Sequence, residues 1–138
     1  NTVENFSKRI VKKFDVRATG TNALASSLSG GNLQKFIVGR EILQEPQLLI
    51  VSQPTWGVDA GAATAIHNEL QDMVFAGAAV LLISQDLDEI FLLSDRIAVI
   101  SEGTLSSARS VEEITANDVG LLMGMRHASD TKSAYVAT

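Results

Sequence analysis

The chain has 138 residues, of which 46% are hydrophobic, and a formal net charge of -5 at pH 7. This length suits one domain or part of one, and this apolar fraction is enough for a packed core. The acidic balance argues against nonspecific nucleic-acid binding, and no apolar run is long enough to cross a bilayer. The absence of cysteine excludes disulfides and thiolate metal sites. Two histidines, His67 and His127, are too few and too scattered for a metal cluster, so we predict no metal site.

The first half of the chain is predicted to contain two helices and a strand. Hydrophobic residues recur at helical spacing over residues 1–14, with basic side chains on a solvated face. Residues 16–27 are small and polar and are predicted to form a loop. A second helix is predicted over residues 32–44, because Pro46 cannot continue it. The continuous apolar run over residues 48–51 predicts a strand buried on both faces of a parallel sheet.

The second half is predicted to continue the alternation of helices and strands. The predicted elements are a helix over 60–76, a buried strand over 79–83, a helix from 86 to 93, a hairpin with strands 96–100 and 104–106, a helix opened by a capping box at Ser110 and Glu113, and a final helix over 117–123. Gly77 suits the position that ends the first of these helices. Together they predict an α/β fold, with a mainly parallel sheet flanked by helices and a C-terminal β-hairpin.

The stretch over residues 28–35 reads Leu-Ser-Gly-Gly-Asn-Leu-Gln-Lys. Unpaired N–H groups at the start of a helix form an anion site, and two glycines allow close approach of the anion. On the glycines alone, an ordinary glycine-rich helix cap is the more common explanation. The whole string, however, resembles the signature motif of ATP-binding cassette (ABC) ATPases. Its Asn-Leu-Gln-Lys ending resembles the cassettes of simple-sugar and nucleoside importers.

Three further stretches keep the order and spacing of that family. Residues 48–55 lie where the Walker B strand should follow, residues 57–59 lie where the D-loop should be, and residues 82–89 lie where the switch-histidine loop should be. The resemblance covers about residues 6–123. It implies part of a P-loop NTPase fold, and specifically the C-terminal part of the second cassette of a tandem ABC importer ATPase.

The resemblance also implies roles for individual residues. In ABC dimers the signature closes over the nucleotide that the opposite cassette holds. The matching positions for this nucleotide contact in trans are Ser29, Gly30, Gly31 and Asn32. Asp59 matches the D-loop carboxylate at the cassette interface. On its own, Asp59 is equally well explained as the N-cap of the helix that follows, and both roles can hold together.

The chain's own site departs from the family pattern. The family has an aspartate, a glutamate and a histidine where this chain has Ser52, Gln53 and Gln85. A serine brings no charge to Mg²⁺, and a glutamine cannot accept a proton from water. No G-x-x-x-x-G-K-[ST] phosphate loop occurs in the sequence. We therefore predict a degenerate site, with no nucleotide bound and no ATP hydrolysis by this chain alone.

The implied function is that of a partial ATP-binding subunit of an ABC importer for simple sugars or nucleosides, with ATP and Mg²⁺ in the full-length transporter. The expected partners are the opposite cassette and transmembrane permease subunits, at the cytoplasmic face of a bacterial-type membrane, and no nucleic acid. Residues 1–31 are expected to end the helical subdomain, residues 32–123 to belong to the ATPase core, and residues 124–138 to form a disordered tail. Because the first residue is not Met, we expect a piece of a longer protein, which would self-associate in isolation through an open sheet edge.

Two other functions remain open from the sequence. One is a nucleotide-independent interaction module that docks to a membrane permease. Equilibrium nucleotide binding by the full-length protein would distinguish it from the ATP-binding subunit. The other is a small flavodoxin-like binding domain, which the lack of an N-terminal strand and phosphate loop disfavours.

Overall fold

The computed structural model describes residues 2–20 and 22–124. Two compact units divide at Gln85 and Asp86, and each is described by itself. His67 lies in a helix of the first unit, whereas His127 and residues 125–138 of the predicted tail fall outside the described residues. No helix in the described ranges is long and apolar enough to span a membrane.

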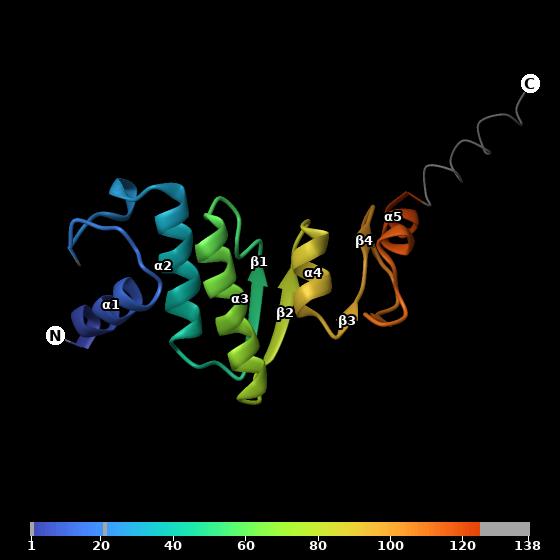
Figure 1. Ribbon diagram of the computed structural model, residues 1–138, viewed down its shortest axis with the longest axis horizontal. Helices are drawn as coiled ribbons and strands as arrows, with labels where there is room; N and C mark the ends of the chain where they lie inside the picture. Colours follow the sequence, from blue (N-terminus) through green and yellow to red (C-terminus); the bar gives the residue numbers. More distant parts are fainter. Residues whose placement is uncertain (1, 21, 125–138) are drawn as a thin grey trace, which may run out of the picture. The chain divides into compact units, whose positions relative to one another are not determined.

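The first unit places its helices on one side of a small parallel sheet (Figure 1). Its elements are α1 (Thr2–Lys13), the short 3₁₀ turn η1 (Ala25–Ser27), α2 (Gly30–Ile42), β1 (Leu48–Ser52), α3 (Ala60–Phe75) and β2 (Ala79–Ile83). The two strands run parallel, with Leu48 opposite Ala79 and Ser52 opposite Ile83. α3 packs against β2, α2 against α3, and α1 against α2. The predicted α/β arrangement with a parallel sheet is confirmed.

Local signals determine where these helices begin and end. The Ser29 side chain caps α2, which ends two residues before the predicted Gln44. The Asp59 side chain caps α3, so the N-cap prediction for this residue is confirmed. After α3, Gly77 has a φ of +98°, the left-handed conformation that glycine adopts at no steric cost.

The core of the first unit lies between the helices and one face of the sheet. Its buried apolar side chains are Ile10, Phe14, Val16, Val38, Ile42, Leu49, Ile66, Leu70 and Met73. Gly39 of α2 is also buried, and a Cβ built on it would lie 2.5 Å from Cδ2 of Phe14. The absence of a side chain at Gly39 therefore allows the close approach of α2 to the end of α1.

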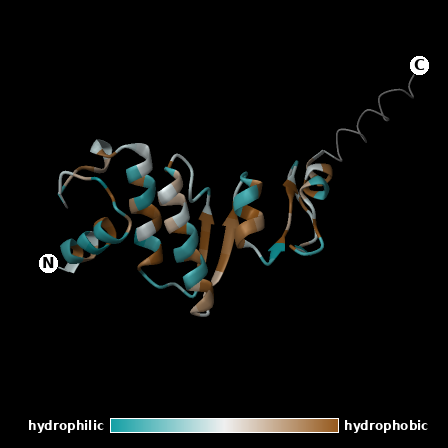
Figure 2. Ribbon diagram, in the orientation of Figure 1, coloured by the Kyte–Doolittle hydropathy of each residue, from teal (hydrophilic) through white to brown (hydrophobic). Residues whose placement is uncertain are grey.

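The prediction that the strands are buried on both faces is wrong. Figure 2 shows β1 and β2 as hydrophobic along their length, but only alternate residues are covered. Leu49 is 6% exposed, whereas the apolar residues of the other face are 47–62% exposed. These exposed residues are Leu48, Ile50, Leu81 and Ile83. The reason is that the helices of this unit cover one face of the sheet and no described residue of the unit covers the other.

The second unit contains two short antiparallel ladders between two helices. Its elements are α4 (Leu87–Leu93), β3 (Arg96–Ile97), β4 (Ile100–Ser101), β5 (Thr104–Leu105), β6 (Arg109–Ser110) and α5 (Ala116–Gly124). Its buried core residues are Ile97, Val99, Ile114 and Val119. The Asp86 side chain accepts hydrogen bonds from the N–H groups of Asp88 and Glu89 and so caps α4, and the helix predicted from 86 to 93 is confirmed.

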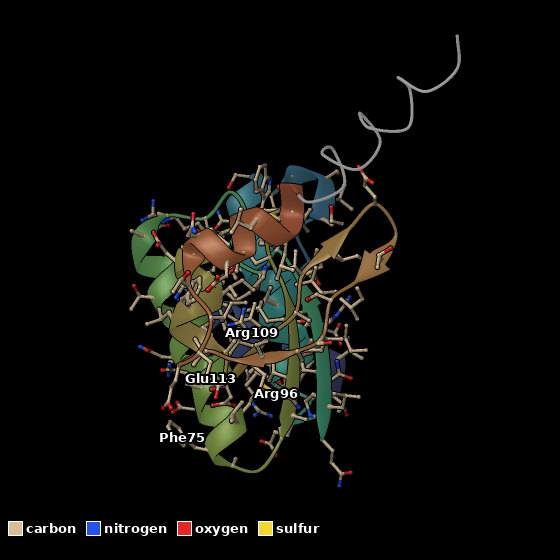
Figure 3. All side chains as sticks on the ribbon, turned by 90° about the vertical axis from the view of Figure 1, so that its right-hand side faces the viewer. Phe75, Arg96, Arg109 and Glu113 are labelled. Carbon is tan, nitrogen blue, oxygen red and sulfur yellow. The ribbon has the colours of Figure 1, made fainter. Side chains whose placement is uncertain are left out.

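The predicted hairpin is only partly correct. β4 and β5 pair around Glu102 and Gly103, both with positive φ. The predicted first strand is wrong at its start, because β3 pairs with β6 instead. Side chains reinforce this second ladder: an Arg96 guanidinium nitrogen donates to the Ala108 carbonyl at 3.1 Å, and Arg109 donates to the Glu113 carbonyl at 2.6 Å (Figure 3).

The helix predicted to open at Ser110 is wrong. Ser110 lies in β6, and residues 111–113 form a turn. Burial of Ile114 in the core and pairing of Ser110 with Arg96 outweigh the local capping pattern. The helix begins at Ala116, where Thr115 and Asp118 form a reciprocal capping box.

Candidate functional site

The signature stretch forms the N-terminus of α2. Ser29 has an extended backbone, and its Oγ accepts hydrogen bonds from Asn32 N at 3.4 Å and from Asn32 Nδ2 at 2.9 Å. Gly30 and Gly31 are the first helical residues, so their N–H groups have no carbonyl acceptor earlier in the helix. This is the geometry that binds an anion, with N–H groups and the positive end of the helix dipole at the same place.

The two glycines differ in their surroundings. A Cβ on Gly31 would lie 2.8 Å from the carbonyl oxygen of Gly57, which is closer than real Cβ contacts. A Cβ on Gly30 would meet nothing within 4 Å. Gly31 is therefore needed for packing of α2 on the loop after β1. Gly30 is open on the side where a side chain would project.

Two polar side chains of α2 hold the segment that follows α1. Asn32 Oδ1 accepts a hydrogen bond from Arg17 N at 2.8 Å. The Lys35 side chain is buried, and its Nζ donates to the carbonyl of Asp15 at 2.6 Å. Asp15 has a φ of +47°, so Lys35 stabilises an uncommon backbone conformation. The Oδ1 and the Nδ2 of Asn32 thus both have hydrogen-bond partners within the chain. The sequence did not indicate this structural role.

The loop after β1 is also tied to α2. Gln53 has a φ of +51°, and its N–H donates to the Ile83 carbonyl at 2.8 Å, which extends the β1–β2 ladder by one bond. Gln34 Nε2 donates to the carbonyls of Gln53 at 2.9 Å and of Pro54 at 3.1 Å. Gln34 was not identified as a site residue from the sequence. The signals were its place in the string over residues 28–35 and its helical spacing, which puts it on the same face as Gly30 and Gly31.

Asp59 follows the same loop. Its Oδ1 accepts from Ala62 N at 2.9 Å, and this hydrogen bond is the main cause that holds the pKa of the exposed Asp59 carboxyl below its ordinary value. The positive charge of Lys35 lowers the pKa of Asp59 further. Asp59 therefore stays ionised as the cap of α3. Its predicted role at an interface between cassettes is not tested by this geometry.

The positions predicted to be degenerate come together at one edge of the sheet. Because β1 and β2 are parallel and in register, Ser52 and Gln53 at the end of β1 lie beside the end of β2, which Gln85 follows. None of the three carries a carboxylate or a charge. In residues 2–20 and 22–124, no group of three or more His, Cys, Asp or Glu side chains is placed to hold a metal ion. The donor set at this edge does not fit Mg²⁺, which prefers carboxylate oxygens.

Comparisons with known proteins give a consistent set of relatives, although no protein-family model matches the sequence. The chain is similar to a nucleoside import ATP-binding protein of Lactococcus lactis, with 49% identity over 123 residues that make up 89% of this chain and 24% of the relative. It is 47% identical over 117 residues to a guanosine import ATP-binding protein of Bacillus subtilis, which spans 85% of this chain and 23% of the relative. The chain thus spans about a quarter of the length of these curated relatives.

Solved structures show the same fold. An ATP-binding subunit of an ABC transporter has a TM-score of 0.74 at 18% identity, over 88% of this chain and 54% of that protein. A dimeric ATP-binding cassette in a post-hydrolysis state, bound to ADP and phosphate, has a TM-score of 0.69 at 20% identity, over 80% of this chain and 47% of that protein.

Proposed function

From the premise that this chain belongs with the ATP-binding proteins of ABC importers for sugars and nucleosides and has the fold of their cassettes, we propose that it is part of the ATP-binding subunit of such an importer. In this proposal its signature stretch contacts the nucleotide that an opposite cassette holds. Its own site lacks the groups for hydrolysis. The subunit would act at the membrane with a transmembrane permease.

The observation that carries this proposal is the difference between the N-terminus of α2 and the sheet edge that carries Ser52, Gln53 and Gln85. The N-terminus of α2 is intact as an anion site, with Gly30 open and the first N–H groups directed along the helix axis. The edge formed by Ser52, Gln53 and Gln85 has no carboxylate to balance the charge of Mg²⁺ and no base to accept a proton. A helix terminus that can accept a phosphate, beside a site that lacks the base, suits a signature donor better than a catalyst.

In this mechanism the residues of α2 stabilise charge and do no proton transfer. ATP, held with Mg²⁺ by the opposite cassette, would supply the reacting phosphoryl group. The N–H groups of Gly30 and Gly31 and the hydroxyl of Ser29 would face its γ-phosphate oxygens. Ser29 Oγ already accepts two hydrogen bonds within the chain, so its own hydrogen is available for donation to a phosphate oxygen.

The test uses the ATPase rate of the full-length, reconstituted importer. Gly30→Asp adds a carboxylate at a position where a Cβ has no described atom within 4 Å, and a carboxylate suits the first turn of a helix. It would, however, stand against a phosphate in the opposite cassette. We expect a loss of roughly 10²–10³ in rate, the usual cost of removing a contact that stabilises a developing charge.

The matched control is Gln53→Ala, which removes a side chain that has no base function and should change the rate little. Equal losses in Gln53→Ala and Gly30→Asp would mean that this half has a working site of its own. Full activity of Gly30→Asp, with no nucleotide bound by the full-length protein at equilibrium, would favour instead a module that docks to a permease.

A further inference from the structure

We propose that Gln34 is a positioning residue that makes the signature turn of α2 and the loop over residues 53–57 move as one rigid piece. This inference rests on the proposed function, in which the signature serves the opposite cassette's nucleotide and the loop belongs to this chain's own site. Gln34 would then couple the two sites mechanically. Gln34 lies one helical turn after Gly30 and Gly31, so its side chain stands between the signature turn and the loop over residues 53–57.

The first contact joins Gln34 to the start of the loop. Its single amide group donates both hydrogens, at 2.9 Å to the Gln53 carbonyl and at 3.1 Å to the Pro54 carbonyl. The Gln53 N–H is meanwhile held by Ile83 of β2 at 2.8 Å. The peptide groups around Gln53, with its positive φ, are therefore fixed from the helix on one side and from the sheet on the other.

The second contact lies at the far end of the loop. The backbone of Gly31 packs against the Gly57 carbonyl so closely that no Cβ fits between them. One contact alone would act as a hinge, whereas two contacts at opposite ends of a five-residue loop resist rotation as well as separation. A displacement of Gly31 by a phosphate would thus reach Gln53, and through Gly57 it would reach Asp59, two residues further along.

Gln44, two residues past the C-terminal end of α2, offers a matched control. Gln44 Nε2 also donates to a backbone carbonyl, that of Arg40, at 3.2 Å. The same Nε2 also donates to Glu41 Oε2 at 3.1 Å. Both bonds are exposed and stay at the C-terminal end of α2, so they tie α2 to no other segment. Replacement of either glutamine by methionine keeps the approximate side-chain volume and removes the donor. Comparison of Gln34→Met with Gln44→Met therefore distinguishes the loss of the link between α2 and the loop from the loss of a glutamine amide as such.

The first measurement is hydrogen exchange of the Gln53 N–H in this chain, which involves no nucleotide. In Gln34→Met we expect exchange at Gln53 to be on the order of tenfold faster, because a hydrogen bond to the partly buried Gln53 carbonyl is lost. The amides within the β1–β2 ladder should keep the native exchange rate. Gln44→Met should leave Gln53 unchanged. If the Gln53 N–H exchanges at the native rate in Gln34→Met, or equally faster in both variants, Gln34 does not link α2 to the loop.

The second measurement is the steady-state ATPase of the full-length importer. In Gln34→Met we expect kcat to fall several-fold with KM for ATP unchanged, because the opposite cassette holds the nucleotide. Because unfolding of part of the importer would also lower the apparent kcat at an unchanged KM, the rate is divided by the concentration of folded importer, and Gln44→Met is assayed beside Gln34→Met. Faster exchange at Gln53 with native kcat would refute the coupling. If Gly30→Asp leaves the ATPase intact while Gln53 exchange still responds to Gln34→Met, the proposed function fails and the tie between the segments stands.

Discussion

The packing of α2 on the end of α1 depends on a missing side chain, which makes Gly39→Ala an informative change. A Cβ at this position would lie 2.5, 2.8 and 2.9 Å from three ring atoms of Phe14. The ring is only 4% exposed and Gly39 itself is buried, so neither has open space to move into. The helix and the aromatic ring must separate to accept one methyl group.

The magnitude follows from two opposing terms. Alanine is favoured over glycine inside a helix by about 1 kcal/mol. Overpacking of a well-packed core costs about 1–3 kcal/mol, and three contacts below 3.0 Å place Gly39→Ala at the upper end of that range. The expected net loss is therefore about 2 kcal/mol in the free energy of unfolding, in spite of the better helix propensity.

The assay is urea unfolding of the chain, followed by far-UV circular dichroism. Gly30→Ala is the control in the same helix, because its Cβ meets nothing within 4 Å and should not lower the midpoint. A Gly39→Ala chain as stable as the native one would refute the reasoning. It would mean that α1 and α2 are not held together at Phe14 by this close approach.

Three further predictions concern other parts of the chain. Gly31→Ala should lower the free energy of unfolding by about 1–3 kcal/mol in the same urea titration, because its Cβ would lie 2.8 Å from the Gly57 carbonyl oxygen. An unchanged unfolding midpoint would contradict this packing. Hydrogen bonds from the N–H of Thr115, and then from its hydroxyl, lower the pKa of Asp118. The ionised Asp118 carboxylate therefore stabilises the fold fully above the ordinary carboxyl pKa, and this stabilisation is lost as the pH falls through the lower pKa of the folded state. The difference in unfolding midpoint between Asp118→Asn and the native chain should shrink over that range, and a constant difference would count against this linkage. Ile50→Lys, on the exposed sheet face, should reduce self-association in sedimentation velocity, and a native chain that sediments as a monomer would contradict this use of the face.

The elements that could be predicted are those specified by neighbouring residues. α3 begins and ends within one residue of its expected bounds, because Asp59 and Gly77 act on the backbone next to them. β2 has its predicted bounds, because an apolar run of five residues followed by polar ones marks a strand. The parallel pairing of β1 with β2 follows from the helix that connects them.

The features that could not be predicted depend on partners far along the chain. Ser110 and Glu113 satisfy the local rule for a capping box, but Ser110 pairs with Arg96, fourteen positions earlier, and no helix begins there. Gln34 and Lys35 bond to carbonyls about twenty positions away. The apolar strands suggested burial on both faces, but burial also depends on what lies over the sheet, and a strand's own residues do not determine that.

The signature stretch shows why a motif match alone says little about which residues contact a ligand. Several of its side chains already make hydrogen bonds that stabilise the fold. Ser29 caps α2, Asn32 bonds to Ser29 and to the N–H of Arg17, and Lys35 donates to the carbonyl of Asp15. Loss of activity after substitution of any of these would report on folding as much as on phosphate binding. Gly30 differs, because within the described residues no packing requires a glycine there. A need for glycine at that position must come from something outside the described residues, which is why Gly30→Asp tests the nucleotide contact more directly than a substitution of Ser29 or Gly31.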